Sequence, residues 1–177
     1  MPASIDRFLS AFRSKDFSTP KRFEARIFFP QNNDFEVPPE NGYETITLRC
    51  ETAELPARTL ATTEQKIYGP IEKFPYLTTY NDLDLTFILD GEMTQKKIFD
   101  DWLSLINPQT SYDFNYKEDY VGDIEISQYD QMNEETYRVM FNEIYPISVG
   151  QLGLDWNAEG YHKLTVTFAY TSWIRLI

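Results

Sequence analysis

Few side chains in this sequence could carry out covalent or acid–base chemistry. The 177 residues include one histidine, His162, and one cysteine, Cys50. His162 alternates with Leu164 on the apolar face of a predicted strand, which favours a structural histidine over a catalytic base. A Ser-His-Asp arrangement would have to use this histidine, and nothing near it in the sequence supports one. We interpret Cys50 as a buried, inert thiol, and a single cysteine excludes an internal disulfide or a Cys-based metal cluster.

Paired carboxylates are the remaining candidates for catalysis. Asp82 with Asp84, and Asp123 with Glu125, are spaced two residues apart on predicted strands, so each pair lies on one strand face. Two carboxylates on one face could serve a glycosidase, although a solvated sheet face is the more common arrangement. The sequence shows no Gly-rich phosphate loop and no calcium-loop spacing. We therefore predict a protein that is not an enzyme and that uses no cofactor or metal.

The aromatic residues point to contact surfaces. Trp102, Trp156 and Trp173 could form a ligand-stacking cleft, but tryptophans more often anchor a core or an interface. Residues 112–120 place three tyrosines and Phe114 in an acidic loop. Because a loop rarely exposes so many aromatic side chains to water, we interpret this loop as a contact surface.

The segments that position these residues are mostly strands. A short helix is predicted at residues 5–12, and a longer helix carries an apolar stripe through Phe99 and Trp102 before Asn107-Pro108 ends it. Residues 57–76 are polar and rich in threonine, and residues 65–68 are one arm of a predicted protruding hairpin. Alternating apolar residues predict six strands, at residues 23–29, 44–50, 82–89, 120–129, 136–144 and 162–170.

These elements predict a mainly β fold in one domain, residues 1–177. The expected architecture is an antiparallel β-sandwich or partly open barrel with one flanking α-helix and the protruding hairpin. The net charge of −12 disfavours nucleic-acid binding, because such binding depends on cations that neutralise phosphates. It fits either solubility or a surface past which DNA slides. Residues 1–6 lack the features of a signal peptide and no apolar run could span a membrane, so we expect a soluble protein with no membrane partner.

Several short motifs occur in a fixed order along nearly the whole chain. They are Phe12…Asp16-Phe17…Pro20…Phe23, residues 50–57, Phe99-Asp100-Asp101-Trp102, Tyr145-Pro146 and the Val-Gly…Leu-Asp-Trp run of residues 149–156. In this order and spacing they resemble the tail tube proteins of contractile-tailed bacteriophages.

The resemblance implies a structural virion protein that assembles in the host cytoplasm. In that family, subunits form hexameric rings that stack into the tail tube, a fold shared with the tube protein of type VI secretion systems. The tube is the conduit for genome ejection, and DNA passes through its lumen without specific binding. Implied partners are other copies of the chain and the tail sheath, baseplate and tail terminator proteins.

Two sets of residues follow as expected sites in such a tube. A hairpin beginning at residues 53–57 would bridge stacked rings, with Leu60, Ile67 and Tyr68 as inter-ring anchors. The carboxylates of Asp82, Asp84, Asp123 and Glu125 are possible lumen-facing groups.

Three other functions remain open from the sequence. The segment at residues 30–43 is longer than is typical of the family, which would suit a tube-initiating baseplate protein of the same fold. An enzyme with an acidic cleft and a monomeric β-sandwich binding module presenting the aromatic loop are the other two.

Overall fold

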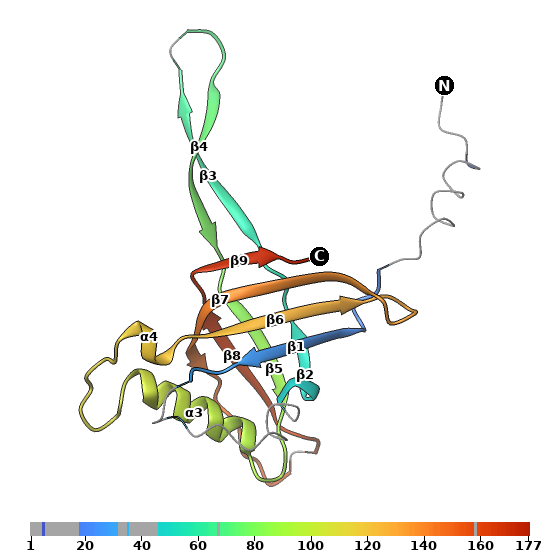
Figure 1. The fold of residues 1–177 in the computed structure, drawn as a ribbon, viewed down its shortest axis with the longest axis vertical. Helices are drawn as coiled ribbons and strands as arrows, with labels where there is room; N and C mark the ends of the chain where they lie inside the picture. Colours follow the sequence, from blue (N-terminus) through green and yellow to red (C-terminus); the bar gives the residue numbers. More distant parts are fainter. Residues whose placement is uncertain (1–4, 6–17, 32–34, 36–45, 67, 158) are drawn as a thin grey trace.

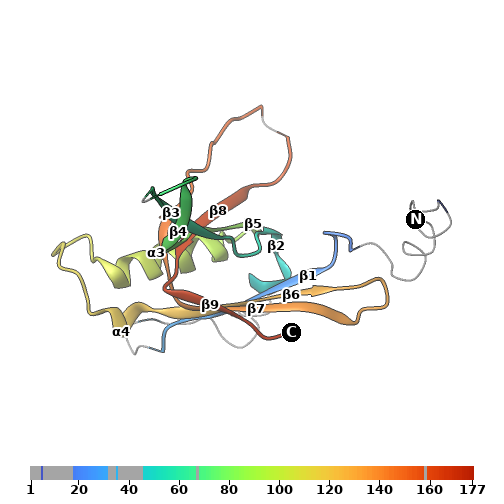
Figure 2. The same ribbon diagram turned by 90° about the horizontal axis from the view of Figure 1, so that it is seen from above.

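Two crossing antiparallel sheets and one long helix make up the body of the molecule (Figures 1 and 2). The computed structural model describes residues 5, 18–31, 35, 46–66, 68–157 and 159–177. Sheet A contains β1 (Phe23–Phe28), β6 (Gly122–Tyr129), the first half of β7 (Glu135–Val149) and β9 (Ser172–Arg175). Sheet B contains the second half of β7, β8 (Lys163–Ala169), β5 (Leu83–Ile88) and β2 (Cys50–Ala53).

The remaining elements lie outside the two sheets. Helix α3 (Thr94–Ile106) flanks them, and the single turn α4 (Lys117–Tyr120) precedes β6. Strands β3 (Arg58–Gln65) and β4 (Glu72–Tyr80) pair only with each other and form a hairpin that projects from the sandwich (Figure 1). The predicted sandwich with a flanking helix and a protruding hairpin is confirmed.

The core forms between the inner faces of the sheets because apolar residues alternate along each strand. On β5, for example, Leu83, Leu85 and Phe87 are buried. Helix α3 closes one side of this core, as its apolar stripe predicted. The Phe99 ring lies 5.1 Å from the ring of Phe87, and the α3 N-terminus is held by Asp90, whose carboxylate accepts the Thr94 N–H at 2.8 Å.

Strand β7 is longer than predicted because it belongs to both sheets. We predicted its end at Ile144, where it leaves its partner β6. The chain then continues as a strand, and from Tyr145 onward it pairs with β8. Pro146 is tolerated inside this strand because, among the described strands, the second half of β7 has a neighbour on one side only.

The prediction of a strand over residues 44–50 is wrong. Residues 46–48 form a helical turn, and the strand β2 begins only at Cys50. Ile46 is 1% exposed whereas Leu48 is 80% exposed, although strand alternation places them on the same face. Successive helical residues are separated by about 100°, so positions two apart point nearly opposite ways.

Smaller differences concern the ends of elements and one strand that the sequence did not reveal. The strand expected from residue 120 begins at Gly122, because residues 117–120 are helical. The predicted hairpin is real but reaches Tyr80, and Gln65 is the last residue of β3 rather than the first of an arm. Strand β9 has only four residues and was not predicted. Three predicted features lie outside the described residues. They are the helix at residues 5–12 (except Ile5), most of the loop at residues 30–43, and the anchor Ile67.

Gly122 provides a direct test of the packing between α3 and sheet A. A Cβ atom at this position would lie 2.3 Å from the Phe28 carbonyl oxygen and 3.3 Å from the Trp102 ring. Since backbone cannot move aside cheaply, we expect Gly122→Ala to lower the free energy of unfolding by about 1–3 kcal/mol. Gly153→Ala is the matched control, because nothing lies within 4 Å of its Cβ. Urea denaturation measures both, and equal stabilities would contradict this packing.

Candidate assembly surfaces

The residues suited to chemistry do not converge. Burial raises the pKa of the Cys50 thiol to about 12, so the thiol stays protonated at neutral pH, in agreement with an inert role. His162 is half-buried beside the β7–β8 loop, and the residues that line the hollow there include no serine or cysteine. Among the described residues, no three His, Cys, Asp or Glu side chains are grouped so that they could hold a metal ion.

The four predicted acidic residues lie on opposite faces of the sandwich. Asp84 alternates with buried Leu83 and Leu85, so it points outward from sheet B, and its carboxylate accepts a hydrogen bond from the Thr167 hydroxyl at 2.6 Å. Asp82, just before β5, is exposed. Asp123 and Glu125 point outward from sheet A, because they alternate with Ile124 and Ile126, which are buried.

The two outer faces differ in how their charges are paired. On sheet A, Arg26 contacts both Glu24 at 3.0 Å and Glu125 at 3.7 Å. Hydrogen bonds from Arg26 help to hold the pKa of Glu24 below its ordinary value. On sheet B, Lys163 pairs with Glu51 at 2.6 Å, and threonines occupy much of the remaining face. Among the residues that the structure describes, neither face gathers the unpaired cations that would bind phosphate.

The three tryptophans are separated, so no stacking cleft forms. Trp102 is fully buried in the core, and its Nε1 donates a hydrogen bond to the Tyr120 carbonyl at 2.7 Å. Trp156 is completely exposed on the β7–β8 loop. Trp173 is partly buried against the core from β9. The aromatic loop predicted as a contact surface is exposed at Tyr112, Phe114 and Tyr116.

The hairpin β3–β4 presents apolar side chains to solvent over its whole length. Of the predicted anchors, Leu60 is half exposed on one face and Tyr68 is 98% exposed at the tip. The cross-strand pairs Ala61–Leu77 and Thr63–Phe74 place Leu77 and Phe74 together on the other face. Isolated two-stranded hairpins are marginally stable in water, so these side chains require a partner surface.

Sequence reasoning missed the apolar side chains on β4 and at Ile71 just before it. Exposed Ile71, Phe74, Tyr76 and Leu77 lie in a stretch where a register shift and Pro75 interrupt simple alternation. The signal that could have revealed them is the density of large apolar residues in positions 71–77, regardless of period.

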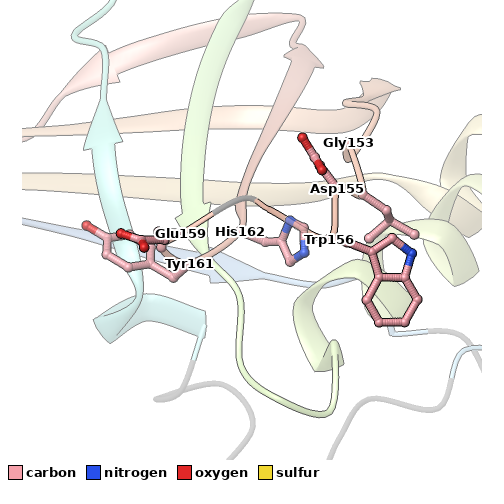
Figure 3. A pocket seen from close by; sticks show the side chains of 8 residues that line it. Gly153, Asp155, Trp156, Glu159, Tyr161 and His162 are labelled. Carbon is pink, nitrogen blue, oxygen red and sulfur yellow. The ribbon is translucent and has the colours of Figure 1, made fainter.

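The β7–β8 loop forms a second exposed apolar surface. It surrounds an open hollow of about 420 Å³. Figure 3 shows Trp156 and Tyr161 on opposite sides of His162 at this hollow. Leu154 on the same loop is 86% exposed. This loop carries the Leu-Asp-Trp motif of the sequence, and the motif contributes to no core within the subunit.

The β7–β8 loop and the hairpin lie at opposite ends of the long axis of the molecule (Figure 1). No helix in the described part of the chain is long and apolar enough to cross a membrane. The subunit therefore displays apolar surface at its two ends and at the aromatic loop, while its sheet faces are polar. This distribution is typical of a protein that joins other subunits through several distinct contacts.

Comparison with known proteins identifies the family. The chain matches the Phage tail tube protein family over residues 18–176. It is 25% identical to the Tail tube protein gp19 of Enterobacteria phage T6, and the match covers 96% of this chain and 98% of that protein.

Solved structures with the same fold come from contractile injection systems. A chain of the anti-feeding prophage baseplate, a 6-fold symmetrised cryo-EM structure, has a TM-score of 0.67 at 14% identity, covering 92% of this chain and 97% of its own. A chain of the extended PVC sheath-tube complex, an extracellular contractile injection system, has a TM-score of 0.61 at 15% identity, covering 94% and 95%. From the sequence match and the fold together, the chain belongs to the phage tail tube protein family and is a structural component of a contractile tail in the virion.

Proposed function

We propose that this protein forms hexameric rings that stack into a hollow tube, the conduit through which the phage genome is ejected. The observation that carries the proposal is the hairpin β3–β4, which projects beyond the sandwich with apolar side chains exposed (Figure 1). The 6-fold symmetry of the baseplate to which a similarly folded chain belongs supports the ring order. Sheath, baseplate and terminator proteins are the further partners of such a tube.

Sheet B is the better candidate for the wall of the lumen. Strands of a barrel tilt about 35–45° from its axis, so they run along the axis more than across it. If the hairpin reaches the next ring, the tube axis follows the long axis of the subunit. Strands β2, β5 and β8 run closer to that axis, whereas β1 and β6 cross it (Figure 1). Among the described strands, β2 and the second half of β7 are the edges that neighbours would join.

This orientation assigns each predicted acidic residue to one side of the tube wall. Asp82 and Asp84 face the lumen with the threonines of sheet B, and Asp123 and Glu125 face away from it. Because Lys163 is paired with Glu51, the wall presents uncompensated negative charge from Asp84. Phosphates would be repelled by such a wall, so DNA would slide past without binding.

Electron microscopy of the purified protein and of the native tail tests the proposal. We expect rings with six subunits stacked around a central channel, each burying more than about 1,000 Å² against its neighbours, as specific interfaces do. Isolated subunits in the native tail, or a different ring order, would overturn the proposal.

Charge reversal tests which face lines the lumen. We expect tubes of Asp84→Lys to retain short DNA duplexes, with an affinity that falls steeply as salt rises, because each new cation releases counterions from phosphate. The matched control is Glu125→Lys on the opposite face. DNA held inside the tubes can be followed at low and high salt by co-sedimentation with labelled duplex after nuclease has digested the DNA bound on the outer surface. Retention by the Glu125→Lys tubes alone would place sheet A at the lumen.

A further inference from the structure

We infer that the β7–β8 loop is the surface that receives the hairpin tip of a second copy of this chain in the adjoining ring. The receiving surface consists of Leu154, Asp155, Trp156, Glu159 and Tyr161, and the hairpin tip consists of residues 64–66 and 68–74. This inference rests on the proposed stacking of rings, and it names both sides of the contact.

The positions of the two surfaces support the pairing. Head-to-tail stacking requires that a surface at one end of the subunit meet a different surface at the other end. The hairpin tip lies at one end of the long axis and the β7–β8 loop at the other (Figure 1). A stack of identically oriented subunits therefore brings the tip of one toward the loop of the next.

The shapes and side chains of the two surfaces are complementary. The tip carries Tyr68 and Ile71, both exposed beyond the end of the paired strands. The hollow of about 420 Å³ beside Trp156 has room for an aromatic or branched side chain, and Trp156 and Tyr161 stand at its sides (Figure 3). Exposed tryptophan and tyrosine are the residue types that most often dominate an interface.

Charge also distinguishes the two surfaces. Residues 150–162 carry two acidic residues, Asp155 and Glu159, and no Lys or Arg, while the neighbouring Lys163 lies 5.4 Å from the centroid of the Tyr161 ring and pairs with Glu51. At the tip, Lys66 and Glu72 are exposed, while Lys73 is engaged by Glu64 at 3.5 Å. An approach of the tip to the loop thus offers Lys66 a carboxylate partner in Asp155 or Glu159.

Truncation of the tryptophan provides the first test. We expect Trp156→Ser to form rings but to lose tube growth, because a tenfold weaker contact repeated six times in a ring weakens stacking about a millionfold. Met132→Ser removes another exposed large apolar side chain, from the turn between β6 and β7, and is the control, with tube growth expected at the wild-type concentration. Sedimentation and electron microscopy distinguish rings from tubes. Trp156→Ser tubes growing as readily as wild-type tubes would overturn the inference.

A charge exchange tests whether the two surfaces meet each other. We expect Lys66→Glu and Asp155→Lys to raise the subunit concentration needed for tube growth several-fold each, and the double variant to restore most of the loss. Additive losses in the double variant would show that the tip binds elsewhere. If the wild-type chain gives no stacked rings even in the native tail, the proposed function itself fails. If the wild-type chain forms tubes but the double variant does not recover tube growth, only the assignment of the receiving surface is overturned.

Discussion

Replacing residues 62–76 with Asn-Gly is expected to leave each subunit folded and to abolish tube growth. The two-residue turn joins Ala61 to its cross-strand partner Leu77, so the base of the hairpin is kept. The removed side chains that the structure describes, residues 62–66 and 68–76, are exposed along the hairpin and lie outside the core of their own subunit. The free energy of unfolding of the free subunit should therefore change by no more than about 1 kcal/mol.

The loss of assembly should be complete because the same contact is removed at every position of a ring. Circular dichroism and urea denaturation report on the subunit, while electron microscopy reports on the tube. Limited proteolysis gives an independent measurement. The wild-type hairpin should be cleaved rapidly in the free subunit and slowly in the tube, since an isolated hairpin buries too little apolar area to offset its ordering entropy. Equal protection in both states would mean that the hairpin packs within its own subunit.

Trp102→Ala is expected to cost about 3–5 kcal/mol of folding stability, a large share of the total for a domain of this size. The indole ring lies 5.1 Å from the Phe29 ring and 6.0 Å from the Phe168 ring, so it connects α3 to both sheets. Its truncation leaves a cavity and removes the hydrogen bond to the Tyr120 carbonyl.

Two other substitutions separate the contributions of this residue. Trp102→Phe removes the hydrogen bond but keeps most of the packing, so we expect a smaller loss of stability. Trp156→Ala removes the exposed tryptophan and should change stability by less than about 0.5 kcal/mol. Urea denaturation of the three variants gives the comparison. Similar losses for the two alanine variants would contradict the assignment of Trp102 to the core and Trp156 to an interface.

Several features of this protein were determined by the sequence alone, because they depend on local periodicity. Alternation along residues 82–89 and 162–170 predicted two strands and the apolar residues that are buried on them. The stripe through Phe99 and Trp102 identified the face of α3 that packs on the sheets. The ordered motifs indicated the family, since they extend over nearly the whole chain. The same periodicity failed at Ile46 and Leu48, where a helical turn reverses the expected face.

Only the tertiary structure decided how these local elements are combined. Alternation shows that Asp84 and Glu125 point away from the core, but it does not reveal that they point from opposite sheets, which depends on long-range strand pairing. Strand β7 continues past Pro146 because it changes partners from β6 to β8. The hairpin and the Leu-Asp-Trp loop occupy opposite ends of the molecule because β5 and β8 pair antiparallel between them. Sequence patterns record which face of an element is buried, whereas the direction in which its other face points is fixed only when distant strands pair.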